Sequence, residues 1–180
     1  MKTTLIFRIS LALLSAVLVL SSFAQKDFGN EFAYRFYPKK SGKFPPSVLY
    51  ANTMSVENIS KKVLEHFKRQ FHNAANVKWE QVNNNFLATF VRGETTTRSL
   101  FTKKGMTIYT IIFSSEKELP SDVKNLIIKN YKNYTITYVA RVEEDDRKIW
   151  VVKLAGANDY ATARVEDGEM EETENFQKAK

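Results

Sequence analysis

Few residues in this 180-residue chain have side chains suited to chemistry, and they are widely spaced. There is no Cys, and the two histidines, His66 and His72, lie six positions apart. That spacing does not place both rings on one face of a helix, as two metal ligands at i and i+4 would be. The sequence also contains no HExxH motif, nucleophile elbow or glycine-rich phosphate loop. We therefore expect no catalytic residues, no metal site and no cofactor.

Carboxylates gather in two runs, over residues 143–146 and 166–174. Either run could hold a calcium ion loosely, but neither has the ligand spacing and turn glycine of an EF-hand loop. Acidic turns solvated by water are the simpler interpretation. With the histidines unsuited to catalysis as well, we predict that the protein is not an enzyme.

The first 24 residues are typical of a secretory signal. Lys2 and Arg8 give a positive start, residues 11–20 form an apolar run, and a Ser-Phe-Ala sequence ends at Ala24. The run is shorter than the roughly 20 residues that cross a bilayer, although a retained membrane anchor is the alternative. We predict cleavage near Ala24 and export to the periplasm or cell surface, with no transmembrane segment in the mature chain.

Charge is divided unevenly along that mature chain. Residues 25–115 contain 14 Lys and Arg against 6 Asp and Glu, whereas residues 116–180 contain 11 against 14. The basic half could steer an acidic partner toward itself, or the two halves could be solvated surfaces of opposite sign. The pI of about 9.5 would permit nucleic-acid binding, but export and the acidic second half argue against it.

The elements that must position these side chains begin with an aromatic and basic N-terminal segment, residues 25–54. Phe32, Tyr34 and Phe36 alternate in it as they would along a strand. Such an aromatic segment either covers an opening of its own fold or adds a strand to a partner.

Hydrophobic periodicity then predicts a helix over residues 56–71, with Ser55 as its N-cap. Strands follow around Trp79 and over residues 86–90, 97–101 and 106–113. The pattern restarts with a helix at Pro120 and strands over 136–142, 150–154 and 161–165, so that a shift of about 60 residues superposes the two halves. The acidic run after Gly168 does not read as a further strand.

These elements predict an α+β fold of two tandem helix-plus-antiparallel-sheet units, residues 55–115 and 116–180. The units would share one curved sheet or pack closely against each other, because each is small for a stable domain. The expected core residues, which alternate along the strands or recur at helical spacing, are Phe67, Phe71, Val77, Trp79, Phe86, Ala88, Phe90, Phe101, Val123, Ile127, Tyr131, Trp150 and Val152.

Several short segments recur in a characteristic order and spacing: Phe71-His72-Asn73-Ala74, Asn76-Val77-Lys78-Trp79, Phe86-x-Ala88-x-Phe90, Gly105, Leu119-Pro120 and Tyr131-Lys132-Asn133-Tyr134. Together they resemble the PepSY-like family of exported bacterial proteins, also described as β-lactamase-inhibitor-like. The resemblance covers residues 56–165 and implies a duplicated helix-plus-sheet fold with no established catalytic residues. An inhibitor of that kind grips its target enzyme with the sheet and hairpin loops, but its contact residues have no match here.

The sheet face away from the helices is the expected binding site. Five of its eight expected residues are Lys or Arg, and cations aligned across strands repel one another unless an anion neutralises them; a merely solvated face is the alternative. The eight residues are Lys78, Glu80, Thr89, Arg98, Thr102, Arg141, Lys153 and Arg164.

We therefore predict a non-enzymatic exported protein that binds an acidic protein partner or an anionic ligand, and not nucleic acid. One alternative is a structural, envelope-associated protein with no discrete ligand. Another, implied by the resemblance alone, is an inhibitor of a secreted or periplasmic hydrolase. The sequence does not define the oligomeric state.

Overall fold

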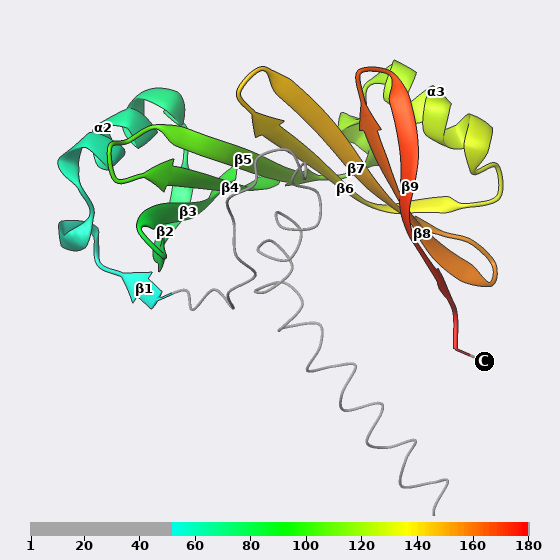
Figure 1. The fold of residues 1–180 in the computed structure, drawn as a ribbon, viewed down its shortest axis with the longest axis horizontal. Coiled ribbons are helices and arrows are strands. Elements are labelled where there is room, and N and C mark those ends of the chain that lie inside the picture. The colour runs from blue at the N-terminus through cyan, green and yellow to red at the C-terminus, as the bar shows by residue number, and fades with distance from the viewer. Residues whose placement is uncertain (1–51, 180) are drawn as a thin grey trace, which may run out of the picture. The chain divides into compact units, whose positions relative to one another are not determined.

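The structure is a computed structural model that describes residues 52–179. Nine antiparallel strands form one sheet in which every strand pairs with its neighbours in chain order (Figure 1). The strands are β1 (Asn52–Met54), β2 (Ala75–Val82), β3 (Asn85–Arg92), β4 (Thr95–Thr102), β5 (Thr107–Ser114), β6 (Thr135–Glu144), β7 (Arg147–Ala155), β8 (Asp159–Glu166) and β9 (Glu169–Gln177).

Helices are few and short in the described part of the chain. The α-helices α2 (Lys61–Gln70) and α3 (Ser121–Asn130) have ten residues each, and each follows a 3₁₀ turn, η2 (Val56–Asn58) or η3 (Glu116–Glu118). The prediction of an α+β fold with two tandem helix-plus-sheet units is therefore wrong. The fold is mostly β, since nine strands outweigh two ten-residue helices. Five residue pairs between β5 and β6 join all the strands into one sheet.

The first helix begins later than its periodicity suggests. Ile59 is extended, and Ser60 is the N-cap of α2, accepting a hydrogen bond from the backbone N–H of Val63 at 3.3 Å. Ser55 instead precedes the 3₁₀ turn and makes no side-chain cap bond. The apolar stripe continues through this break, so hydrophobic spacing alone could not reveal it.

Helix α2 packs on β2, β3 and β4 through an aromatic cluster, which we call the α2 cluster. The Phe67 ring lies 5.1 Å from the rings of Trp79 and Phe90 and 5.4 Å from that of Phe71, centroid to centroid. Val77 is partly buried at its margin. The buried members are Ile59, Val63, Phe67, Phe71, Trp79, Phe86, Ala88, Phe90 and Phe101.

Helix α3 packs on β6, β7 and β8 through a mostly aliphatic cluster, the α3 cluster. Trp150 is its one buried aromatic residue, and Tyr131 is partly buried beside it. The buried members are Leu119, Val123, Ile127, Val139, Trp150, Val152, Leu154, Ala161, Ala163 and Val165.

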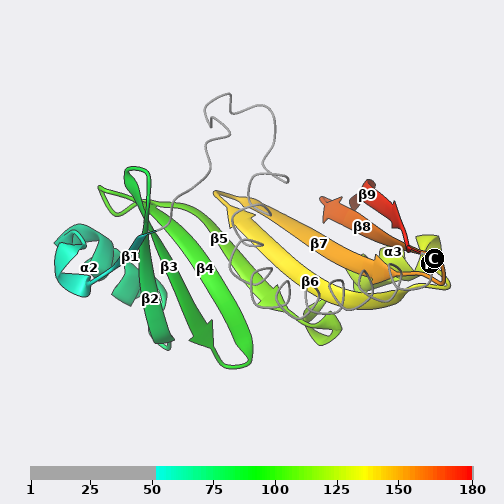
Figure 2. The same cartoon turned by 90° about the horizontal axis from the view of Figure 1, so that it is seen from below.

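Both clusters lie on the same side of the sheet. Direct cross-strand pairing runs from Phe90 through Thr97, Ile112 and Arg141 to Trp150. Because directly paired residues point to one face, this line connects the α2 cluster to the α3 cluster. We call this side the helix side and the opposite one the helix-free face, since none of the described helices packs on it (Figure 2).

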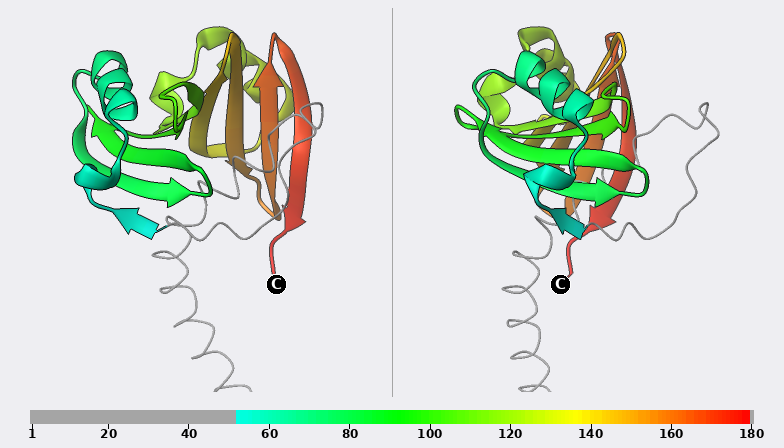
Figure 3. Two further views of the ribbon diagram at one scale, coloured as in Figure 1. Left: turned by 60° about the vertical axis from the view of Figure 1, so that its left-hand side comes forward. Right: turned by 90° about the vertical axis from the view of Figure 1, so that its left-hand side faces the viewer.

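The acidic run after Gly168 forms strand β9, contrary to the sequence-based expectation. Asp167 and Gly168 both have positive φ, 50° and 80°, as the central residues of a type I′ hairpin turn require. Among the described strands β9 is at the sheet edge (Figure 3), where carboxylates remain solvated and discourage edge-to-edge pairing. The formation of strand β9 is therefore better explained by the Asp167-Gly168 turn than by the strand propensity of its residues.

The predicted signal segment and most of the N-terminal aromatic segment lie outside the described residues. Within residues 52–179, neither helix has the length and apolar character needed to span a bilayer.

Candidate binding face

Register places seven of the eight expected site residues on the helix-free face. A row of directly paired residues across neighbouring strands shows the composition of this face. Lys78 pairs with Thr89, Thr89 with Arg98, and Arg98 with Ile111. The line continues through Val142 and Ile149 to Glu166. The face therefore changes from polar to apolar and back to charged as it crosses the sheet.

Arg141 is the exception, because it lies on the helix side. A register shift between Ile136 and Tyr138 changes which residues of β6 point to each face. Arg141 pairs with Trp150 and places its guanidinium 5.5 Å from that ring, while its Nε lies 3.0 Å from Glu143 Oε1. On the helix side it thus lies between Ile112 and Trp150 in the cross-strand pairing.

The first polar group of the helix-free face surrounds Arg98. This side chain is only 8% exposed; its Nε donates to Thr89 Oγ1 at 3.3 Å, and its Nη2 lies 3.6 Å from Glu80 Oε2. Burial raises the pKa of the nearby Tyr138 hydroxyl, while the positive charge of Arg98 acts in the opposite direction. Arg98 is therefore a buried, neutralised structural cation and not an open anion receptor.

The second polar group joins β7, β8 and β9. Arg147 Nε donates to Glu166 Oε1 at 2.7 Å, its Nη2 donates to Glu166 Oε2 at 3.0 Å, and Arg164 also binds Glu166. The hydrogen bond from Arg147, followed by the charge of Arg164, holds the Glu166 pKa below its ordinary value. These cations are also neutralised within the chain.

A hollow of about 350 Å³ lies beside this second group. Carboxylates outnumber cations in its lining, so an anionic ligand is disfavoured there. No group of three or more potential metal ligands was found among the described residues. The lining residues are Arg164, Glu166, Asp167, Glu169, Met170 and Glu171.

An apolar stripe lies between the two polar groups, and sequence reasoning missed it. Each of its side chains is 8% exposed or less, and none belongs to the α2 or α3 cluster. A signal was present, because residues 108–113 and 149–152 are apolar at nearly every position, as in strands buried on both faces. The stripe consists of Leu87, Leu100, Tyr109, Ile111, Val142, Ile149 and Val151.

Three further expected site residues lie at the margins of this face. Lys78 is exposed, whereas Thr102 and Lys153 are half-buried. Thr102 Oγ1 accepts the backbone N–H of Met106 at 3.1 Å and so supports the β4–β5 turn. Lys78 is therefore an exposed cation of the expected set.

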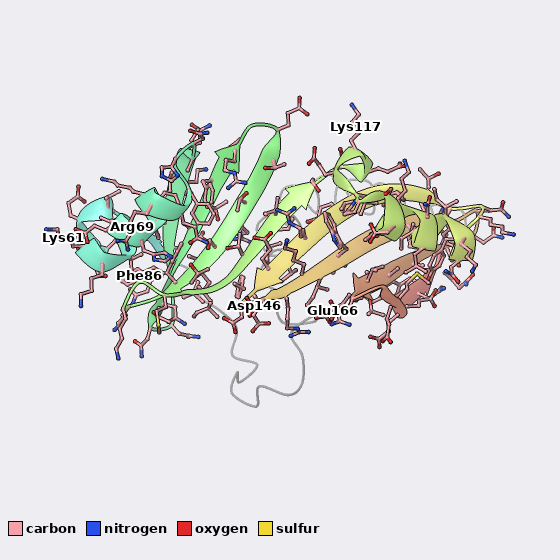
Figure 4. All side chains as sticks on the ribbon, turned by 90° about the horizontal axis from the view of Figure 1, so that it is seen from above. Lys61, Arg69, Phe86, Lys117, Asp146 and Glu166 are labelled. Atoms are coloured by element: carbon pink, nitrogen blue, oxygen red, sulfur yellow. The ribbon has the colours of Figure 1, made fainter. Side chains whose placement is uncertain are left out.

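The histidines do not form a reactive pair. His66 Nε2 lies within hydrogen-bonding distance of Gln70 Oε1, at 3.1 Å, and of Thr107 Oγ1, at 3.2 Å. These contacts link α2 to β5, while His72 is exposed beyond the helix. Lys61 and Arg69 of helix α2, which carries His66, are labelled in Figure 4.

The fold resembles several solved structures from Bacteroides. A DUF2874 family protein from Bacteroides uniformis aligns with a TM-score of 0.55 and 16% identity, over 66% of this chain and 88% of that one. A protein from Bacteroides eggerthii, provisionally described as periplasmic, gives 0.54 and 16% over 63% and 88%. A BLIP-like protein from Bacteroides fragilis gives 0.55 and 16% over 79% and 95%.

These likenesses define the fold class and nothing finer. No protein-family model matches the sequence, and no curated protein matches it either. The fold is that of the BLIP-like and DUF2874 structures, and the PepSY-like assignment in particular is not supported.

Proposed function

We propose that this chain is a non-enzymatic exported protein that binds a protein partner through its helix-free face. The observation that carries the proposal is that none of the described helices packs on this face, and that charged side chains, several of them ion-paired, lie along its margins. Charged groups at the rim of an interface steer and orient a protein partner. The provisional periplasmic description of one structural neighbour is consistent with the export that the signal-like N-terminus predicts.

The partner should be a macromolecule and not a small anion. The cations Arg98, Arg147 and Arg164 are already paired with carboxylates of the same face. An anionic ligand would have to displace these intramolecular partners. The exposed Lys78 on the same face can contact an acidic partner surface, and such rim charges mainly accelerate association.

Charge reversal at Lys78 provides the test. The variant Lys78→Glu should capture its partner from a cross-linked native envelope fraction about threefold less than wild type, equivalent to about 0.7 kcal/mol. The matched control is Lys68→Glu, which reverses one exposed charge on helix α2. Captured proteins are identified and quantified by mass spectrometry.

Equal capture by wild type and both variants would contradict a partner site on the helix-free face. A chain that captures nothing specifically would instead favour the structural, envelope-associated alternative. Circular dichroism of all three proteins would establish that the substitutions leave the sheet intact.

A further inference from the structure

We infer that the start of helix α2 and the β4–β5 turn form a docking surface for an anionic lipid membrane. We call this surface the basic tip. Because it shares no residue with the helix-free face, membrane docking does not require the proposed protein partner. The basic tip consists of five exposed residues, Lys61, Lys62, Lys103, Lys104 and Met106.

Two contacts hold the β4–β5 turn against the start of the helix. The hydroxyl of Ser60, the N-cap of α2, donates to the backbone oxygen of Lys103 at 3.1 Å. Gly105 comes so close to the helix that a Cβ there would lie 2.8 Å from the backbone oxygen of Lys62. The turn accordingly lies beside α2 at one end of the sheet (Figure 1). The fold therefore brings together lysines that are 40 residues apart in the sequence.

The described part of the chain does little to neutralise these cations. Lys61 Nζ lies 3.8 Å from Glu65 Oε1, but both side chains are exposed, so this pair contributes little. Within residues 52–179, no carboxylate forms an ion pair with Lys62, Lys103 or Lys104. Such a concentration of like charge is unfavourable in the isolated chain and attracts an anionic surface.

The stability of helix α2 does not account for its two lysines. The helix dipole disfavours cations in the first turn, and α2 has no acidic residue there. At the corresponding place in the second half, α3 has Asp122 in its first turn, and the β8–β9 turn is Asp167-Gly168. The same position in the fold is thus basic in one half and acidic in the other, so the backbone arrangement does not require lysines.

An exposed apolar side chain favours a lipid surface over a soluble polyanion. Met106 follows Lys104-Gly105 in the turn and is 59% exposed, the largest value among the exposed large hydrophobic residues of the described chain. Proteins that bind at a membrane surface combine basic residues, which attract anionic headgroups, with apolar side chains that enter the boundary between headgroups and acyl chains. A soluble polyanion would offer Met106 no apolar surroundings.

Co-sedimentation of residues 25–180 with lipid vesicles provides the test. Wild type should bind vesicles of equal parts phosphatidylglycerol and phosphatidylcholine at least about tenfold better than vesicles of phosphatidylcholine alone, because only the former carry net charge. Salt at about 1 M, where the Debye length is about 3 Å, should remove most of that preference. The variant Lys62→Glu/Lys103→Glu/Lys104→Glu should bind the charged vesicles at least about tenfold less than wild type.

The matched control reverses three exposed lysines of the second half, Lys117→Glu/Lys129→Glu/Lys132→Glu. It has the same net charge as the basic-tip variant, and Figure 4 shows Lys117 well away from Lys61. The control should bind the charged vesicles within about twofold of wild type, because charges more than about 8 Å apart are largely screened at physiological ionic strength. Circular dichroism establishes that both triple variants keep the sheet.

Met106→Ser distinguishes a membrane from other acidic partners. It should weaken binding to the charged vesicles about threefold or more, because the serine side chain gains nothing from the acyl boundary. Unchanged binding by Met106→Ser would overturn the inference and identify the basic tip as a site for a soluble polyanion or an acidic protein. Equal losses in the two triple variants, or no preference of wild type for charged vesicles, would overturn it as well. The vesicles contain no protein, so none of these results depends on the helix-free face.

Discussion

Helices α2 and α3 occupy corresponding places, one before β2–β5 and one before β6–β9, yet they pack with different chemistry. Phe67 and Ile127 lie at the same position of their helices, each on the buried side. Phe67 inserts among aromatic rings, whereas Ile127 packs in a cluster with one buried aromatic residue. The backbone order therefore does not dictate the kind of core; it only requires that both helix-side surfaces be filled.

Replacing Phe67 or Ile127 by alanine should show how much each cluster contributes to the free energy of unfolding. Phe67→Ala should lower the free energy of unfolding by about 3–5 kcal/mol, and Ile127→Ala by about 2–5 kcal/mol. Phe67 should be the costlier of the two because each aromatic pair adds about 0.5–1.5 kcal/mol beyond area burial. Urea denaturation followed by circular dichroism measures both. An equal or larger loss for Ile127→Ala would show that the ring geometry contributes nothing.

A second difference between the halves concerns two hairpin glycines. Gly105 and Gly168 both have positive φ, 88° and 80°. A Cβ on Gly105 would lie 2.8 Å from the backbone oxygen of Lys62 in α2, whereas a Cβ on Gly168 would meet nothing within 4 Å. Gly105 thus permits close contact between a sheet turn and helix α2, and Gly168 supports only its own turn.

Replacing each glycine by alanine separates backbone strain from that close contact. Gly168→Ala should cost about 1–2 kcal/mol, the strain of a left-handed conformation. Gly105→Ala should cost clearly more, because α2 must also move. Thermal and urea unfolding of the two variants provide the comparison. Equal losses of unfolding free energy in the two variants would mean that helix α2 moves away from the new methyl group at no cost.

The strands of this fold can be predicted from the sequence better than the way they assemble into a sheet. Alternation correctly indicated the strands around Trp79 and Trp150, because one face of each packs against a helix. It could not indicate that β5 and β6 pair, since that contact depends on register between distant segments. The duplicated appearance of the sequence left open whether the two units share one curved sheet or pack against each other, whereas the pairing of β5 with β6 makes one sheet.

The candidate site was harder to predict for a related reason. Parity along a strand assigns faces only while the register holds, and the shift between Ile136 and Tyr138 put Arg141 on the helix side. Counting cations also ignored their partners, because Glu80 on β2 lies beside Arg98 on β4 and Glu166 binds Arg164 on the same strand. The two-sided apolar runs of β5 and β7 were the better guide to the helix-free face.

The smallest expected difference between the halves is in acid sensitivity. Hydrogen bonding from Arg147, together with the charge of Arg164, lowers the Glu166 pKa from its ordinary value of 4.5. Because the folded-state pKa is the lower one, this group stabilises the fold above about pH 4.5, and the contribution is lost as pH falls through the folded pKa. Since the pair is partly solvated, its contribution should be about 1 kcal/mol or less.

Glu166→Gln should therefore lower the free energy of unfolding at neutral pH by up to about 1 kcal/mol, and the difference from wild type should vanish below the folded-state pKa. Glu94→Gln, in an exposed turn of the first half, is the matched control. Urea titrations from pH 7 to pH 3 measure both series. If the free energy of unfolding of Glu166→Gln ran parallel to that of wild type from pH 7 to pH 3, the acid sensitivity of the fold would come from other groups. A group whose proton binding does not change on folding cannot produce a pH-dependent difference.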